Sequence, residues 1–157
     1  MKISFFAWLA MLVLPAVAHA ADPAPVPYPE GYRDWTHVKS MVIEPGHPLY
    51  EAFGGIHHLY ANEAALKGYR SGKFPDGSVI VFDLLEANPG GNAVQEGARK
   101  VLGVMHRDAK RWSATQGWGF EAFKGDSKTE RAVGAKSATA CCQCHTSRKD
   151  HDYVFSR

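Results

Sequence analysis

Sulfur and imidazole side chains are concentrated near the end of this 157-residue chain. The run Cys141-Cys142-Gln143-Cys144-His145 holds all three cysteines of the sequence and contains the spacing Cys-x-x-Cys-His. Two thiols three residues apart lie on one face of a helical turn, where they match the two vinyl groups on one edge of a porphyrin. The next residue then directs its imidazole toward the iron. The motif therefore predicts one covalently bound haem c, with thioethers at Cys141 and Cys144 and with His145 as the metal ligand.

Two other chemistries use the same residue types. A thioredoxin-like dithiol usually lies at the end of a strand in a βαβ unit, and the sequence shows no such pattern. A zinc site needs a second pair of ligands, and only His151 lies nearby. Cys142 is left outside the haem motif, and we interpret it as a small buried residue, with a redox-sensitive thiol as the alternative.

The second axial position of the iron decides the class of function, because an electron carrier usually supplies a Met or a second His there. After the first twenty residues the chain has only Met41 and Met105, both in alternating apolar runs that predict core packing. One of the adjacent His57 and His58 must face inward if they lie on a strand. The remaining histidines apart from His145 are His37, His47, His106 and His151. The sequence leaves the second axial ligand open.

The first twenty residues read as a secretion signal. Lys2 precedes an apolar run over residues 3–17, and Ala18-His19-Ala20 has the small-x-small pattern of a cleavage site. We expect residues 1–20 to be removed and the protein to be periplasmic, without membrane insertion after cleavage. Residues 21–157 are expected to form a single domain.

The composition is that of an ordinary globular protein, with 45% hydrophobic and 22% charged residues. A formal net charge of +2 speaks against a polyanion binder, so no nucleic acid partner is expected. Three cysteines are too few for a disulfide framework.

Hydrophobic periodicity predicts an α+β domain built on a mainly antiparallel sheet of about five strands. A short helix is expected between Asn62 and Gly72, because these residues are typical of a helix start and a helix end. A loop is expected at 88–92, and a second short helix at 137–144 would carry the haem-attachment motif. The expected strands cover residues 35–43, 56–61, 78–85, 99–106 and 118–123.

Several segments resemble the cytochrome P-460 and cytochrome c′-β family. The likeness covers roughly residues 28–157, and the haem motif near the C-terminus follows a β-rich region. It is carried by Tyr32-Arg33-Asp34-Trp35, Val38-Lys39-Ser40-Met41-Val42-Ile43, Gly72-Lys73-Phe74-Pro75-Asp76-Gly77-Ser78, Arg107-Asp108-Ala109-Lys110-Arg111-Trp112, Gly117-Trp118-Gly119-Phe120-Glu121 and Asp152-Tyr153-Val154-Phe155.

This resemblance implies a homodimer with a five-coordinate haem, a proximal ligand at His145 and an enclosed distal pocket. Members called P-460 carry a covalent link from a Lys to the porphyrin and oxidise hydroxylamine, whereas members called c′-β lack the link and bind gases such as nitric oxide. Lys67 and Lys73 are the candidates for such a link, although we interpret the chain as unlinked. Phe53 and His57 are the candidate residues of the distal pocket.

The leading interpretation is a periplasmic c-type monohaem protein whose open distal site binds small nitrogen-oxide ligands. One alternative is a hydroxylamine-oxidising haem oxidoreductase of the P-460 type with a Lys–haem cross-link. A second alternative is a simple periplasmic electron-transfer cytochrome c that works with a redox partner.

Overall fold

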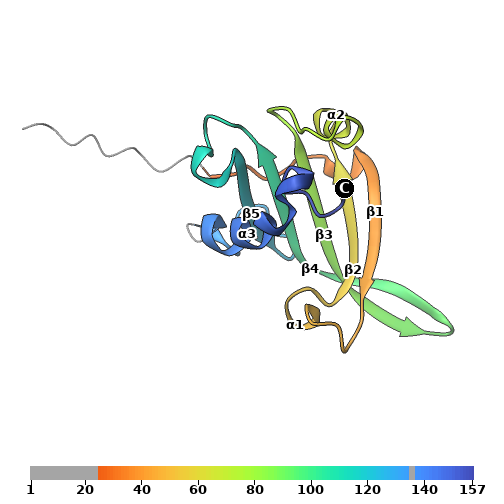
Figure 1. Cartoon of the computed structure of the whole chain (residues 1–157). Coiled ribbons are helices and arrows are strands. Elements are labelled where there is room, and N and C mark those ends of the chain that lie inside the picture. Colours follow the sequence, from red (N-terminus) through yellow and green to blue (C-terminus); the bar gives the residue numbers. More distant parts are fainter. Residues whose placement is uncertain (1–24, 135–136) are drawn as a thin grey trace, which may run out of the picture.

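The computed structural model describes residues 25–134 and 137–157, so the expected signal segment 1–20 lies outside the described residues (Figure 1). Its centre is a five-stranded antiparallel sheet in which each strand pairs with its neighbour in sequence. The predicted α+β fold is therefore confirmed. The strands are β1 (Thr36–Ile43), β2 (Gly55–Ala61), β3 (Val79–Gly90), β4 (Ala93–Arg107) and β5 (Trp118–Lys124).

Short helices connect and cover the strands. The α-helices are α1 (Tyr50–Phe53), α2 (Glu63–Ser71) and α3 (Ser137–His145), and a 3-10 helix follows α3 at Thr146–His151. Helix α2 begins and ends as predicted, because the side chain of Asn62 accepts a hydrogen bond from the Ala65 amide and Gly72 adopts a left-handed conformation. The sequence did not predict α1. No helix in the described part of the chain is long and apolar enough to cross a membrane.

The loop expected at 88–92 is wrong, because most of this segment belongs to strands. Asn88 pairs with Gln95, and Gly90 pairs with Ala93, so only two residues turn the chain. Gly91 and Asn92 both have a φ of 59°, a left-handed conformation that Gly and Asn tolerate. A tight turn therefore replaces the loop, and β3 and β4 extend together beyond the rest of the sheet (Figure 1).

Side chains alternate between the two faces of the sheet and build two apolar clusters. One face, which we call the N-terminal face, carries Val81, Leu102 and Phe123 and is covered by Val26 and Tyr32. The opposite face, which we call the C-terminal face, lies under α3 and the C-terminal segment (Figure 1). The second cluster on that face comprises Ala61, Ala65, Phe74, Ile80, Trp118, Phe120 and Val154.

A buried carboxylate ties the N-terminal segment to the sheet. Asp83 in β3 is fully buried, and its oxygens accept hydrogen bonds from the Tyr32 hydroxyl at 2.6 Å and from Arg99 Nε at 2.6 Å. Arg33 adds an ion pair at 3.2 Å. Burial, together with the hydrogen bond to Asp83, raises the pKa of Tyr32 to about 12. This group fixes β3, the central strand, from the side opposite to α3.

Candidate haem site

Helix α3 places its cysteines differently with respect to the core. Cys141 and Cys142 are half-buried and pack against the apolar cluster of the C-terminal face, whereas Cys144 is exposed. All three are free thiols. Burial raises the pKa of the Cys141 thiol, and the nearby Glu121 carboxylate acts in the same direction. Cys141 and Cys144 lie three residues apart on one side of the helix, as the attachment motif requires.

His145 ends the helix with its ring held between two aromatic side chains. The ring centroid lies 4.9 Å from that of Phe120 in β5 and 5.0 Å from that of Phe155. His145 Nδ1 donates a hydrogen bond of 2.7 Å to the carbonyl oxygen of Tyr153, which can only accept. Burial lowers the pKa of His145, and the hydrogen bond to Tyr153 partly opposes this effect.

The two nitrogens of this imidazole therefore differ. Because Nδ1 carries the proton, the neutral ring has its lone pair on Nε2, and no described residue forms a hydrogen bond with that atom. Metal-bound histidines commonly show this arrangement, in which a carbonyl holds one ring nitrogen and the other faces the metal. The residues present thus fit a haem iron bound at His145 Nε2.

A strip of apolar and small side chains continues from His145 across the C-terminal face. Ala122 in β5 shares this face with Phe120, and its partners across the sheet are Gly103, Phe82 and Leu59. Phe82 and Leu59 are only half-buried. Gly103 adds no side chain to the strip, and a Cβ atom there would be in ordinary contact with the Phe82 side chain at 3.4 Å. An apolar surface with such small side chains suits the face of a porphyrin.

The distal-pocket candidates lie on this same face and contact each other. His57 is 1% exposed, and its Nε2 donates a hydrogen bond of 2.5 Å to the carbonyl oxygen of Phe53. The rings of His57 and Phe53 pack at 4.6 Å and 5.9 Å, respectively, from the ring of Phe82. Phe82 was missed by the sequence analysis, although it shares a strand face with Ile80 and Leu84 by simple alternation.

Within this group His57 holds the end of α1 through Nε2 and keeps its other ring nitrogen buried. Its Nδ1 is buried and has no hydrogen-bond partner among the described residues. Burial lowers the pKa of His57, which keeps the ring neutral. The hydrogen bond from Nε2 holds the end of α1, so His57 positions the exposed ring of Phe53.

The other histidines and methionines considered for the second axial position are dispersed. His37, His58 and His106 lie on the N-terminal face, separated from His145 by the sheet. Met105 packs on the core of the C-terminal face, as predicted. The prediction of core packing is wrong for Met41, which is 50% exposed, because β1 is an edge strand.

The candidate cross-linking lysines are exposed. Lys67 lies on α2, and Lys73 lies in the connection between α2 and β3. No described residue forms a hydrogen bond or an ion pair with either ammonium group. The structure brings neither of them into contact with Phe53 or His57.

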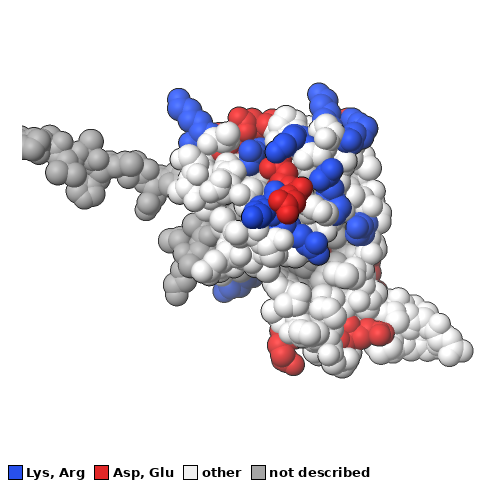
Figure 2. Space-filling view, viewed as in Figure 1, with Lys and Arg blue, Asp and Glu red and all other residues white. Residues whose placement is uncertain are grey.

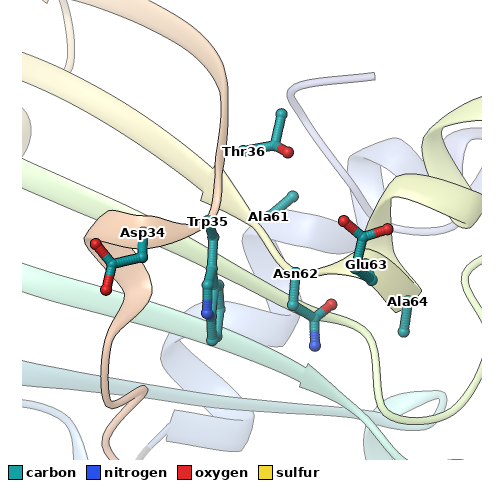
Figure 3. A pocket seen from close by; sticks show the side chains of 7 residues that line it. All are labelled: Asp34, Trp35, Thr36, Ala61, Asn62, Glu63 and Ala64. Atoms are coloured by element: carbon teal, nitrogen blue, oxygen red, sulfur yellow. The ribbon is translucent and has the colours of Figure 1, made fainter.

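Two surface hollows lie away from the haem motif. The first, of about 490 Å³, is shown in Figure 3 between the start of β1 and the start of α2. It is lined by Asp34, Trp35, Thr36, Ala61, Asn62, Glu63 and Ala64. The second, of about 520 Å³, lies beside α1 and Lys100. Neither includes Cys141, Cys144 or His145, so the haem motif is not part of these hollows.

Comparison with known proteins agrees with this site. A search of curated proteins found no match. The family model for cytochrome P460 matches residues 29–156, which include every described element of the fold and the whole Cys-x-x-Cys-His motif. The chain therefore belongs to the cytochrome P460 family and is a haem-binding cytochrome.

Proposed function

We propose that the protein is a periplasmic c-type monohaem protein whose open distal site binds small nitrogen-oxide ligands such as nitric oxide and hydroxylamine. In this proposal Cys141 and Cys144 add across the two vinyl groups, and His145 is the axial ligand. The observation that carries it is the state of His145, whose Nδ1 is held by the Tyr153 carbonyl while Nε2 has no partner among the described residues.

When bound, the haem supplies an iron that coordinates a small ligand and exchanges single electrons. The side chains around the haem determine which ligands reach the iron. Phe53 and Phe82 present apolar rings on the same sheet face as His145, which favours small uncharged ligands. His57 keeps Phe53 in place through the carbonyl hydrogen bond.

The positions of the other histidine and methionine side chains support an open distal position on the iron. His37, His58 and His106 are on the opposite face of the sheet, and Met105 is packed in the core. An electron carrier usually supplies a Met or a second His to the iron, and these four side chains lie behind the sheet or within its core; His57, on the face of His145, is buried and held by the Phe53 carbonyl. This observation favours ligand binding over the simple electron-transfer alternative.

Ligand binding to the reduced holoprotein tests the proposal. We expect carbon monoxide and nitric oxide to bind rapidly, because no protein side chain has to leave the iron first. Absence of binding, or binding limited by slow release of a side chain, would overturn it in favour of the electron carrier. Phe53→Ala is expected to speed association by opening the distal side, whereas Leu49→Ala, at another exposed apolar residue just before α1, should leave the rate unchanged.

The enzymatic alternative has its own signature. Steady reduction of an artificial acceptor driven by hydroxylamine would show turnover, and a far red-shifted ferrous Soret band would indicate a modified haem. Lys67→Met and Lys73→Met would then identify the linked side chain. An ordinary high-spin spectrum without turnover supports the gas-binding proposal.

Covalent attachment is tested by separate cysteine variants. Cys141→Ala and Cys144→Ala are each expected to leave one thioether and to weaken haem retention on a denaturing gel, and the double variant is expected to lose retention. Cys142→Ala is the matched control and should retain haem fully. Full retention in the double variant would place the attachment elsewhere.

The surface charges indicate which kind of redox partner the protein would attract. Figure 2 shows many Lys and Arg side chains over the region of α2 and the C-terminal segment, with acidic side chains among them and near α1. The exposed basic residues of these segments are Lys67, Arg70, Lys73, Arg148, Lys149 and Arg157. A periplasmic redox partner with an acidic surface would be attracted to this region. A homodimer remains part of the proposal through the family resemblance.

A further inference from the structure

The segment after the haem motif contains an unusual turn. Asp152 and Tyr153 are consecutive residues with φ values of 53° and 66°, in the left-handed region that non-glycine residues rarely adopt. Such a conformation costs free energy and persists only where surrounding contacts enforce it. The contacts that enforce this turn should therefore matter for what the turn does.

Asp152 supplies those contacts with two different oxygens. Its carboxylate Oδ2 accepts a hydrogen bond of 2.8 Å from the Phe74 amide, at the connection between α2 and β3. Its backbone carbonyl accepts one of 2.9 Å from Nε1 of Trp118, which is fully buried in β5. The turn is thus attached both to the connection between α2 and β3 and to strand β5, and the buried Val154 follows it.

The turn directs the next carbonyl at the predicted iron ligand. The Tyr153 oxygen accepts the hydrogen bond from His145 Nδ1 at 2.7 Å. This bond keeps the proton on Nδ1, orients the ring and makes Nε2 a stronger electron donor. A rotation of the turn would remove the acceptor, because the carbonyl direction is set by the left-handed backbone.

We propose that Asp152 is a positioning residue for His145: its carboxylate holds the left-handed turn that presents the Tyr153 carbonyl to Nδ1, and it thereby sets the electron donation of His145 to the haem iron. This inference rests on the proposed function, in which His145 is the axial ligand. Loss of the carbonyl acceptor weakens the donation, which disfavours the ferric state.

Three substitutions at Asp152 separate the effect of the carboxylate from the effect of the backbone strain. Asp152→Asn keeps an oxygen that can accept from the Phe74 amide and tolerates the left-handed conformation. Asp152→Ala removes the acceptor and keeps the strain. Asp152→Gly removes the acceptor but relieves the strain. Asp150→Ala, at the exposed acidic neighbour, is the matched control.

The measurements are the midpoint potential of the holoprotein and the iron–histidine stretching frequency of its ferrous form by resonance Raman spectroscopy. We expect Asp152→Ala to raise the potential and lower the stretching frequency, and Asp152→Gly to do the same. Asp152→Asn and Asp150→Ala are expected to match the wild type. A wild-type potential and stretching frequency in both Asp152→Ala and Asp152→Gly would overturn the proposal. Neither the Asp152 carboxylate nor the backbone strain at Asp152 would then affect His145.

A variant at Trp118 tests the proposal if the Asp152 variants do not fold. Trp118→Phe removes the indole donor to the Asp152 carbonyl together with part of the buried ring, and keeps an aromatic ring in the core. It should shift both values only slightly, because the Asp152 carboxylate still holds the turn; a large shift of both would overturn the proposal, because the indole rather than the carboxylate would then hold it. Failure of the proposed function looks different, because wild-type protein would then show no bound haem or no iron–histidine band.

Discussion

Replacement of His145 by glycine is expected to abolish the iron–histidine stretching band of the ferrous protein while the haem stays covalently attached. In the proposed attachment the thioethers depend on Cys141 and Cys144, whereas the axial bond depends on the Nε2 lone pair. External imidazole should restore the band, because the space between Phe120 and Phe155 then holds a free imidazole. Absorption and resonance Raman spectra of the variant, with and without imidazole, provide the measurement.

His151→Ala is the control for this experiment, since His151 lies in the same segment and its Nδ1 contacts only the Arg157 carbonyl, at 3.1 Å, among the described residues. It should keep the wild-type spectrum. An unchanged iron–histidine band in His145→Gly would contradict the assignment of the axial ligand, whatever the retention of haem.

Removal of the Asp83 carboxylate is expected to cause the largest loss of stability. Asp83→Ala leaves the guanidinium of Arg99 in a largely buried position without its main partner, and such a loss costs about 3–5 kcal/mol of the free energy of unfolding. The Tyr32 hydroxyl loses its acceptor as well. Urea unfolding of the holoprotein, followed by circular dichroism, measures the change.

Asp126→Ala provides the comparison, because its carboxylate also pairs with Arg99 but is 85% exposed. Exposed ion pairs contribute about 0–1 kcal/mol, so this variant should be nearly as stable as the wild type. Equal losses in the two variants would mean that burial of Asp83 does not govern the interaction. Phe82 and Leu84 flank Asp83 in β3 and lie on the face of the distal-pocket candidates. The less stable Asp83→Ala variant should therefore also bind distal ligands at a changed rate.

Local sequence patterns were sufficient to predict most of the secondary structure. Alternation identified β2 through Ile56, His57 and His58, and the end signals Asn62 and Gly72 identified α2. These features depend on side chains within a few residues of each other, so a window of sequence contains the physical cause.

The same approach failed where a distant partner sets the conformation. Asn88 and Pro89 look like loop residues, but pairing with Gln95 and Val94 makes them part of a strand. Met41 follows an apolar pattern but lies on the edge strand β1, which pairs only with β2 among the described strands. Neither the pairing nor the edge position is visible in a local window.

The sequence by itself predicted the haem chemistry of this protein, because the spacing of Cys141, Cys144 and His145 within about one helical turn is the one that covalent haem attachment requires. Only the tertiary structure decided how His145 is prepared for the iron. The Tyr153 carbonyl reaches Nδ1 through a left-handed turn that Asp152 attaches to Phe74 and Trp118. Those contacts join residues 34 to 78 positions apart, and such closures follow from the packing of the whole sheet rather than from any local pattern.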